Sequence, residues 1–269
     1  MECFILSVNE LELTDRWMTS FFRLSDTLPK RKVCREFLGP YASSGLPVCV
    51  QLMGRDPELM AAGALRMLEA GAASIDLNFG CPVPRVVKGG AGGALLREKE
   101  LMFRITEKTA ARTGKEQLSV KFRCGFDSPE ELEETAKALL DAGAGKLFFH
   151  YRTVKELYAP VPGPERAARF RRLLDLARGT PVILNGDFAF DEAAAAPERF
   201  GCAGVMLGRS FLRSPGILRR LGGLSECPPE RFFRTLVRNG LEGEALKGMK
   251  RWIFGAWNFP VPEEESHGQ

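Results

Sequence analysis

The sequence predicts an α/β protein built around a parallel β-sheet, and two observations carry this prediction. Short apolar runs recur through the middle of the 269-residue chain, and each is nearly continuous in apolar residues. Strands that are buried on both faces have this pattern. Amphipathic helical segments separate the runs, so that a strand–helix unit repeats and implies parallel strands with helices outside them.

Seven segments are expected to form the strands. They are 17–24 (WMTSFFRL), 48–53 (VCVQLM), 74–78 (SIDLN), 118–122 (LSVKF), 146–150 (KLFFH), 181–185 (PVILN) and 204–208 (GVMLG). Two of the segments between them show clear helix starts. Asp56 is a plausible N-cap before Pro57, and Gly71 can end that helix. Ser128 and Glu131 form a capping box before the other.

Polar side chains stand at the carboxyl ends of nearly all these strands. They are Gln51, Asn78, Lys121 with Arg123, His150 with Arg152, Asn185 with Asp187, and Gly208 with Arg209. In a closed (β/α)8 TIM barrel these ends converge on one rim, where the active site lies. An open doubly wound sheet would gather only those near its switch point. Six contributing strands therefore favour the barrel.

A complete barrel has eight strands, whereas the sequence supplies seven and lacks the first. Without it, unpaired backbone groups would be exposed at two edges. We therefore expect the DNA upstream of Met1 to encode a short apolar strand in frame, and the extended protein to be more soluble. The predicted domains are a barrel at 1–221 and a short C-terminal helical segment at 222–269, whose tail at 260–269 reads as disordered.

The composition excludes several classes of protein. A net charge of +4 permits a nucleic-acid partner without requiring one. The seven cysteines form no C-x-x-C pair and no cluster with histidine, so we expect no metal site and no disulfide framework. No apolar run approaches the roughly 20 residues that span a membrane. The N-terminus lacks a basic region before its apolar residues, so a cytoplasmic protein is expected.

One cysteine stands apart in the segment 74–96 (SIDLNFGCPVPRVVKGGAGGALL). Cys81 lies between Gly80 and Pro82 in a turn directly after a predicted strand, ahead of a glycine-rich loop that we expect to be flexible. A free cysteine is most often a small buried hydrophobic residue. A thiol in a turn at the rim can instead be a nucleophile or a general acid, and the residues alone leave these roles open.

Three further features have a functional and a structural interpretation. Lys121 follows an apolar run, where a buried lysine could stabilise negative charge on a cofactor, although a solvated lysine is commoner. His150 is one of two histidines, and a lone histidine is more often structural. The glycine turns after the last two strands either bind a phosphate or only turn the chain.

Five motifs in the same order resemble those of the tRNA-dihydrouridine synthase family. They are DLNFGCP with GGALL, VKFRCGFDS, HYRT with a following tyrosine, PVILNGDF and GVMLGRSFL, and together they extend from about residue 17 to 218. The resemblance implies an FMN-containing (β/α)8 barrel. Such an enzyme takes electrons from NADPH and reduces the C5–C6 double bond of specific uridines in tRNA.

The resemblance also implies roles for individual residues. Cys81 matches the cysteine that protonates C5 of the uracil. The implied FMN contacts are Gln51, Asn78, Lys121 and His150, with Asn185, Gly186, Asp187, Gly208 and Arg209 around the phosphate. The implied substrate contacts are Asn78, Arg123, Arg152 and Tyr158. Tyr151 stands where the family has glycine, and we expect its ring to crowd the phosphate region.

The implied partner is tRNA, bound by a monomer, and the target uridine must be flipped out of its stack. Basic clusters at 29–35, 169–172 and 247–251 are candidate RNA contacts, or else ordinary solvated faces. Two alternatives stay open. The chain could be a flavin-dependent reductase of a small pyrimidine or enone, or an inactive RNA-binding remnant that holds no FMN.

Overall fold

The computed structural model describes residues 2–177 and 179–254, so the predicted disordered tail at 260–269 lies outside the described residues. The chain forms two compact units, one made of Arg16–Met206 and the other of Met1–Asp15 with Leu207–Gln269. The predicted division into a barrel domain at 1–221 and a helical segment at 222–269 stays a prediction. Each compact unit is described by itself below.

The larger unit is built on one parallel sheet. Its hydrogen-bonded order is β1 (Trp17–Met18), β3 (Val48–Met53), β4 (Ser74–Phe79), β5 (Leu118–Arg123), β6 (Lys146–His150), β7 (Val182–Asn185) and β8 (Gly204–Met206). A further short strand, β2 (Phe22–Arg23), also pairs with β3. The six predicted strands from 48–53 onward are confirmed to within a few residues, because continuous apolar runs between polar turns leave few other interpretations.

The segment predicted as one strand at 17–24 is interrupted. β1 pairs with Val48 and Cys49, and β2 pairs with Leu52 and Met53. Between them, the Thr19 hydroxyl accepts a hydrogen bond from the backbone N–H of Gln51 at 3.1 Å. A side-chain oxygen thus replaces a backbone carbonyl for that donor, and the strand position continues past the break.

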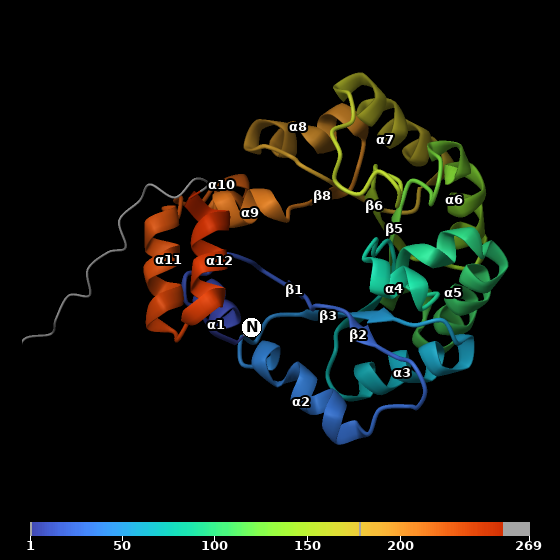
Figure 1. Ribbon diagram of the computed structural model, residues 1–269, viewed down its shortest axis with the longest axis horizontal. Coiled ribbons are helices and arrows are strands. Elements are labelled where there is room, and N and C mark those ends of the chain that lie inside the picture. The colour runs from blue at the N-terminus through green and yellow to red at the C-terminus, as the bar shows by residue number, and fades with distance from the viewer. Residues whose placement is uncertain (1, 178, 255–269) are drawn as a thin grey trace, which may run out of the picture. The chain divides into compact units, whose positions relative to one another are not determined.

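The helices lie on the outer side of the curved sheet (Figure 1). They are α2 (Arg31–Ala42), α3 (Pro57–Glu69), α5 (Lys99–Thr113), α6 (Leu132–Asp141), α7 (Gly163–Ala177) and α8 (Phe190–Phe200). Shorter turns are α4 (Pro84–Lys88), η1 (Gly92–Arg97), η2 (Lys115–Gln117) and η3 (Pro129–Glu131). This arrangement confirms the predicted (β/α)-barrel class. Seven strand positions are filled, and β1 and β8 each have one strand neighbour in the described chain.

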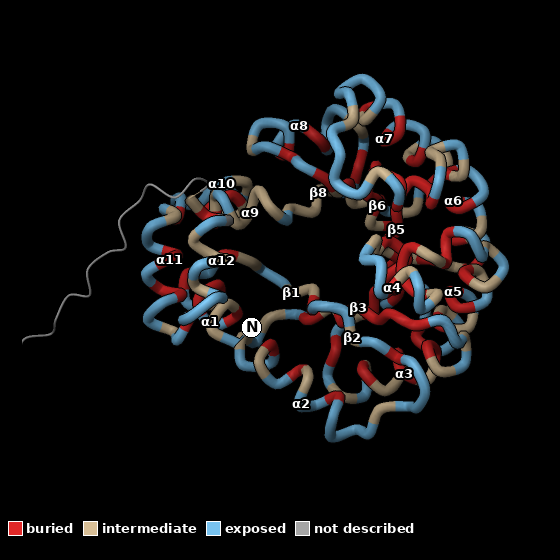
Figure 2. The backbone as a smooth tube through the Cα atoms, viewed as in Figure 1, coloured by how far each residue is buried: buried red, intermediate tan, exposed pale blue. Residues whose placement is uncertain are grey.

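The core of this unit lies between the strands and the inner faces of the helices, where buried residues concentrate (Figure 2). Val50, Leu77 and Val120 are fully buried on neighbouring strands. On the helix side, Phe122 and Phe149 lie 5.4 Å apart between ring centroids, and Phe149 meets Phe170 of α7 at 6.2 Å. Burial on both faces explains why these strands are apolar throughout.

The predicted helix starts are confirmed in detail. The Asp56 carboxylate accepts a hydrogen bond from the backbone N–H of Leu59 at 2.7 Å. The capping box of Ser128 and Glu131 is present, and the Glu131 carboxylate accepts from the backbone N–H of Phe126, Asp127 and Ser128 at 2.9 Å each. These caps satisfy backbone donors that a helix end leaves without partners.

The smaller unit is helical. It contains α1 (Glu2–Glu10), α9 (Arg209–Arg213), α10 (Ile217–Leu221), α11 (Pro229–Arg238) and α12 (Gly243–Phe254). Phe4 of α1 packs edge-on against Phe211 and Phe232, with ring centroids at 6.4 and 5.8 Å. α11 begins at Pro229, within the predicted helical segment at 222–269. The first residues of the chain therefore belong with its last helices.

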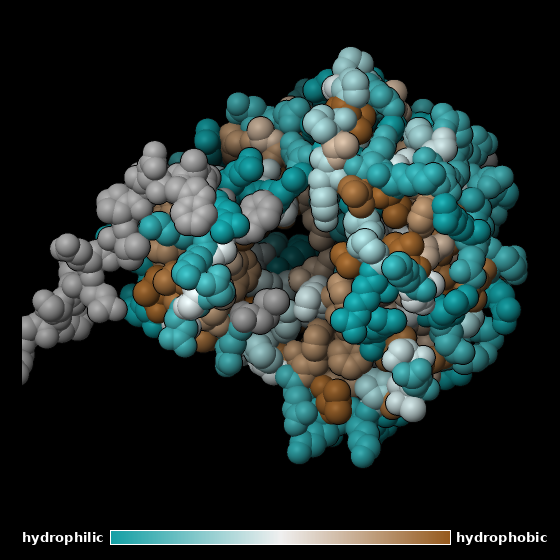
Figure 3. All heavy atoms as spheres, in the orientation of Figure 1, coloured by the Kyte–Doolittle hydropathy of each residue, from teal (hydrophilic) through white to brown (hydrophobic). Residues whose placement is uncertain are grey.

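None of the described helices is long and apolar enough to cross a membrane. On the face seen in Figure 3, the outer rim over α5 to α7 is mostly hydrophilic, with separate hydrophobic patches between.

The cap at Asp56 yields a test of the fold. We expect Asp56→Ala to lower the free energy of unfolding by about 1 kcal/mol, because the Leu59 N–H loses its acceptor. Asp56→Asn keeps a side-chain oxygen at the same place and should cost much less. Urea denaturation of the three proteins measures both differences. Equal losses in the two variants would contradict the assigned cap.

Candidate functional site

The candidate site lies at the carboxyl ends of the strands, where the register lines up polar residues in two rows. Gln51, Asp76 and Ser119 are direct cross-strand partners on β3, β4 and β5. Two residues further along, Asn78 is the partner of Lys121. Alternate residues of a strand face the same side, so both rows point to the same side of the sheet.

Asp76 is the centre of the first row. It is fully buried, and its two carboxylate oxygens accept hydrogen bonds from the Ser119 hydroxyl at 2.7 Å and the Gln51 amide at 2.8 Å. Burial raises the pKa of Asp76 to about 6, while these two donors and the nearby Lys121 oppose the rise. Asp76 is not among the residues that the sequence singled out. The available signal was an acidic residue inside an otherwise apolar strand.

The carboxylate sets the direction of a chain of amides. Because the Gln51 –NH₂ donates to Asp76, its carbonyl oxygen must face Asn78, and it accepts from the Asn78 amide at 2.7 Å. The Asn78 oxygen is then directed away and accepts from the backbone N–H of Gly80 at 3.1 Å and of Cys81 at 3.0 Å. A buried carboxylate thereby determines the conformation of the loop that carries the thiol.

Cys81 is half-buried and packs against Met53, Val86 and Ala91. Its carbonyl accepts from the backbone N–H of Gly93 at 3.0 Å. A Cβ at Gly93 would approach that carbonyl to 2.9 Å and a Val154 methyl to 2.6 Å. The glycine at position 93 therefore permits close packing around the cysteine, where we had expected a flexible loop. Burial raises the pKa of five other cysteines, which are Cys34, Cys49, Cys124, Cys202 and Cys227.

Lys121 is half-buried, and in the described chain its ammonium has no hydrogen bond or ion pair. Desolvation lowers its pKa to about 8, with Arg123 acting in the same direction and Asp76 and Cys81 opposing it. A cation in this state gains from an anionic or electron-rich ligand, because such a ligand would compensate its lost hydration.

The Arg123 side chain forms hydrogen bonds with backbone carbonyls. Its guanidinium donates to the carbonyls of Gly80 at 2.9 Å, and of Thr153 and Leu157 at 2.8 Å each. Tyr158, which is 59% exposed, lies with its ring 5.5 Å from the same guanidinium. The arginine thus joins two rim loops and supports the exposed aromatic ring.

Arg152 has a similar role in the loop that follows β6. It is 3% exposed, donates to the Ala159 carbonyl at 2.6 Å and forms an ion pair with Asp187 at 2.8 Å. Its remaining terminal nitrogen is buried without a hydrogen-bond partner in the described chain. Asp187 has a positive φ of 49°, so the ion pair holds a strained turn directly after β7.

Tyr151 is buried between the site and α7. Its ring stacks on His150 at 5.4 Å and meets Phe170 edge-on at 5.5 Å. A Cβ at Gly186 would lie 2.5 Å from this ring, so the tyrosine is accommodated because position 186 has no side chain. Asn185 beside it donates to the Met206 carbonyl at 2.9 Å and joins β7 to β8. Of the residues implied around a phosphate, Asn185, Gly186 and Asp187 thus follow one strand, whereas Gly208 and Arg209 belong to the helical unit.

Several residues of the three basic clusters form ion pairs with glutamates of this chain. In 29–35, Arg31 pairs with Glu69 and Lys32 with Glu36. In 169–172, Arg169 is buried and bound to Glu156 and Glu165. Lys247 in 247–251 pairs with Glu244. Their role as RNA contacts remains a prediction.

A parallel sheet of the (β/α)-barrel type, with a thiol, an ammonium and several amides at its strand ends, places the chain among barrel proteins whose site lies on this rim. A family model described as dihydrouridine synthase (Dus) matches residues 8–233. The chain belongs to the dihydrouridine synthase family.

Curated relatives agree with this family. The chain is 35% identical over 214 residues to a tRNA-dihydrouridine(16) synthase of Neisseria meningitidis serogroup B, covering 77% of this chain and 63% of that protein. A protein of the same name from Haemophilus influenzae is 33% identical over 265 residues, covering 93% and 83%. The chain thus spans slightly less than two thirds of the first relative.

Solved structures show the same fold. The old yellow enzyme homologue from Zymomonas mobilis matches with a TM-score of 0.60 and 16% identity over 86% of both chains. Morphinone reductase matches with a TM-score of 0.61 and 13% identity, over 86% of this chain and 83% of that one. At these identities the likeness concerns the fold alone.

The amide chain leads to a prediction about Asp76. In Asp76→Asn, the Ser119 hydroxyl can accept from the new NH₂ group, while donating to the Ile75 carbonyl, or donate to the new oxygen. The new amide can therefore present either its oxygen or its NH₂ group to Gln51, so the orientation of Asn78 is no longer fixed. We expect the free energy of unfolding to fall by about 1–3 kcal/mol. We also expect alkylation of Cys81, followed by mass spectrometry, to become faster. Ser119→Ala is the control, since it keeps the carboxylate. Unchanged Cys81 alkylation in Asp76→Asn would refute the dependence.

The lowered pKa of Lys121 predicts a pH effect. Above pH 8 the folded chain releases this proton, whereas the unfolded chain retains it up to about 10.5. The unfolded state therefore binds more protons in this window, and stability due to this group rises with pH. Without added ligand, Lys121→Met should be more stable than the unmodified chain at pH 7, and this advantage should shrink toward pH 10. Urea unfolding at several pH values measures it, and parallel stability curves would contradict the assignment.

Proposed function

We propose that this protein is a flavin-dependent tRNA-dihydrouridine synthase, which reduces the C5–C6 double bond of a uridine in tRNA. The observation that carries the proposal is the placement of Cys81, held by Asn78, beside the strand that carries Lys121, whose ammonium has no hydrogen bond or ion pair among the described residues. Relatives named for position 16 of tRNA support that uridine as the target.

The residues present fit an FMN cofactor. The half-buried Lys121 ammonium, which has no partner in the described part of the chain, suits an electron-rich ring system and would favour its anionic reduced form. Gln51, Asn78 and His150 would line the same ring. Asn185, Gly186 and Asp187 would hold the phosphate, and the buried terminal nitrogen of Arg152, which has no hydrogen-bond partner in the described chain, is a further donor on that side. Bound FMN would supply hydride to C6, with NADPH as the electron donor.

The protein's own residues would then handle the proton and the orientation of the base. Cys81 would hold a proton on Sγ and deliver it to C5, since its loop is fixed by two hydrogen bonds to Asn78. Tyr158 offers an exposed ring near the rim for stacking, and Arg123 supports it from below. The two rim loops would exclude water from the base once it is flipped.

The remaining expectations follow from the substrate. A tRNA-modifying enzyme would act in the cytoplasm, and a monomer suffices because all the proposed site residues come from one chain. The main competitor is a flavin-dependent reductase of a small pyrimidine or enone, which would turn over free uridine as readily as tRNA.

Cys81→Ala tests the proposal directly. The variant should retain FMN and oxidise NADPH but lose at least about 100-fold in dihydrouridine formation, because general-acid catalysis typically contributes that much. Cys202→Ala, a buried cysteine outside the site, is the matched control. Dihydrouridine in tRNA is quantified by mass spectrometry, and bound flavin by absorbance. Full activity of Cys81→Ala would refute the assigned acid, and turnover of free uridine alone would favour the competitor.

A further inference from the structure

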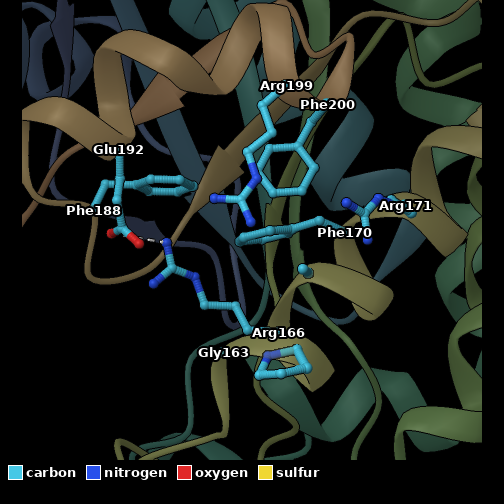
Figure 4. Close-up of a pocket in the computed structure, with 10 residues that line it drawn as sticks. Gly163, Arg166, Phe170, Arg171, Phe188, Glu192, Arg199 and Phe200 are labelled. Carbon is cyan, nitrogen blue, oxygen red and sulfur yellow. Dashed lines mark hydrogen bonds and ion pairs between the residues drawn. The ribbon is translucent and has the colours of Figure 1, made fainter.

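A pocket of about 500 Å³ lies between α7 and α8, which are on the outer side of the sheet (Figure 4). Its lining residues are Gly163, Pro164, Arg166, Ala167, Phe170, Arg171, Phe188, Glu192, Arg199 and Phe200. None of them was assigned a role in the proposed chemistry. The volume is within the range that accommodates small ligands.

The charge of the pocket is unbalanced. Three arginines face one glutamate, and Glu192 is already paired with Arg166 at 3.3 Å. In the stretch of chain that the structure describes, Arg171 and Arg199 have no ion pair and no hydrogen bond. Two uncompensated guanidinium groups, one from each helix, therefore remain, and they favour an anionic ligand.

Aromatic rings form the floor and hold these guanidinium groups. Phe170 and Phe188 are buried and stack at 5.6 Å, and Phe200 meets Phe170 edge-on at 5.6 Å. The guanidinium carbons of Arg171 and Arg199 lie 5.7 and 5.1 Å from the Phe200 ring. Cations placed over an aromatic ring keep a defined position without an acidic partner, so they stay available to a ligand.

The pocket adjoins the strand-end site through one residue. The Arg166 guanidinium carbon is 5.6 Å from the Tyr151 ring, and Tyr151 stacks on His150 at the end of β6. The Tyr151 ring therefore separates the pocket from the residues that would surround the flavin. When the target base of an RNA strand lies in the strand-end site, a neighbouring segment of the same strand can lie in the pocket between α7 and α8.

We propose that this pocket binds a nucleotide from a single-stranded segment of the substrate RNA. Arg171 and Arg199 would each bind one of two successive phosphates, and the apolar floor would receive the ribose and base between them. This proposal rests on the proposed function, since it assumes an RNA substrate. An RNA segment fits better than a free nucleotide, because two arginines on different helices suit the phosphates of a continuous strand.

The test uses the full chain with bound flavin. In Arg171→Gln/Arg199→Gln, affinity for unmodified tRNA and for pentauridylate should fall about tenfold by fluorescence anisotropy. The dependence of log K on log salt should become shallower by about 1.4, at 0.7 for each lost phosphate contact. Arg104→Gln/Arg112→Gln removes the same charge from exposed positions on α5, outside the pocket and the three basic clusters, and is the matched control. Flavin content and melting temperature should stay unchanged in both.

The outcomes separate this proposal from the proposed function. Equal losses in the two double variants, or unchanged RNA binding in the pocket variant, would overturn it even if dihydrouridine is still formed. Binding of uridine monophosphate that depends on the two arginines, with no binding of pentauridylate, would also overturn it in favour of a free nucleotide. If pentauridylate binding depends on the arginines while no dihydrouridine is formed, the pocket stands and the proposed function fails.

Discussion

The geometry of the site depends on one buried carboxylate, that of Asp76. It lies in the centre of three neighbouring strands, and its two oxygens receive donors from β3 and β5. Burying a charge is costly, as the pKa of about 6 shows, so these donors are required for the carboxylate to remain ionised. An ionised carboxylate can accept hydrogen bonds but cannot donate them. It therefore fixes the orientation of the Gln51 amide, which in turn fixes that of the Asn78 amide.

The consequence reaches the chemistry through Gln51 and Asn78. An amide side chain can face either way, and an ambiguous amide at Asn78 would leave the Cys81 loop without a fixed acceptor. The Asp76 carboxylate, two residues before Asn78, removes this ambiguity through Gln51. Asp76 is thus a positioning residue, and the backbone of the half-buried Cys81 is held in place by the hydrogen bond that its N–H donates to the Asn78 oxygen.

Arginine has three different environments in the larger unit. Arg123 and Arg152 are buried and join rim loops by donating to backbone carbonyls. Arg169 is buried in an ion-pair network. Arg171 and Arg199 rest on an aromatic ring without an acidic partner in the described chain. Of these five arginines, only Arg171 and Arg199 have a whole guanidinium without a hydrogen bond or ion pair in the described chain, so burial and partners, rather than residue type, distinguish structural from binding arginines.

The sequence by itself determined the strands, the helix starts at Asp56 and Ser128, and the position of Cys81 in a turn at the rim. These features are local, since apolar periodicity and capping depend on residues a few positions apart. The family motifs also indicated which strand ends carry the site. The interruption near Thr19 was missed, because its hydroxyl replaces a backbone acceptor for Gln51, which is 32 residues away.

Only the tertiary structure decided which polar groups meet. Asp76 looks like a minor irregularity in an apolar strand until the register places it between Gln51 and Ser119, which are 25 and 43 residues away. The basic run at 169–172 divides in the same way, because Arg169 turns inward to Glu156 while Arg171 faces the pocket. Such partnerships depend on strand register and helix packing, which bring together residues that no short segment of sequence relates.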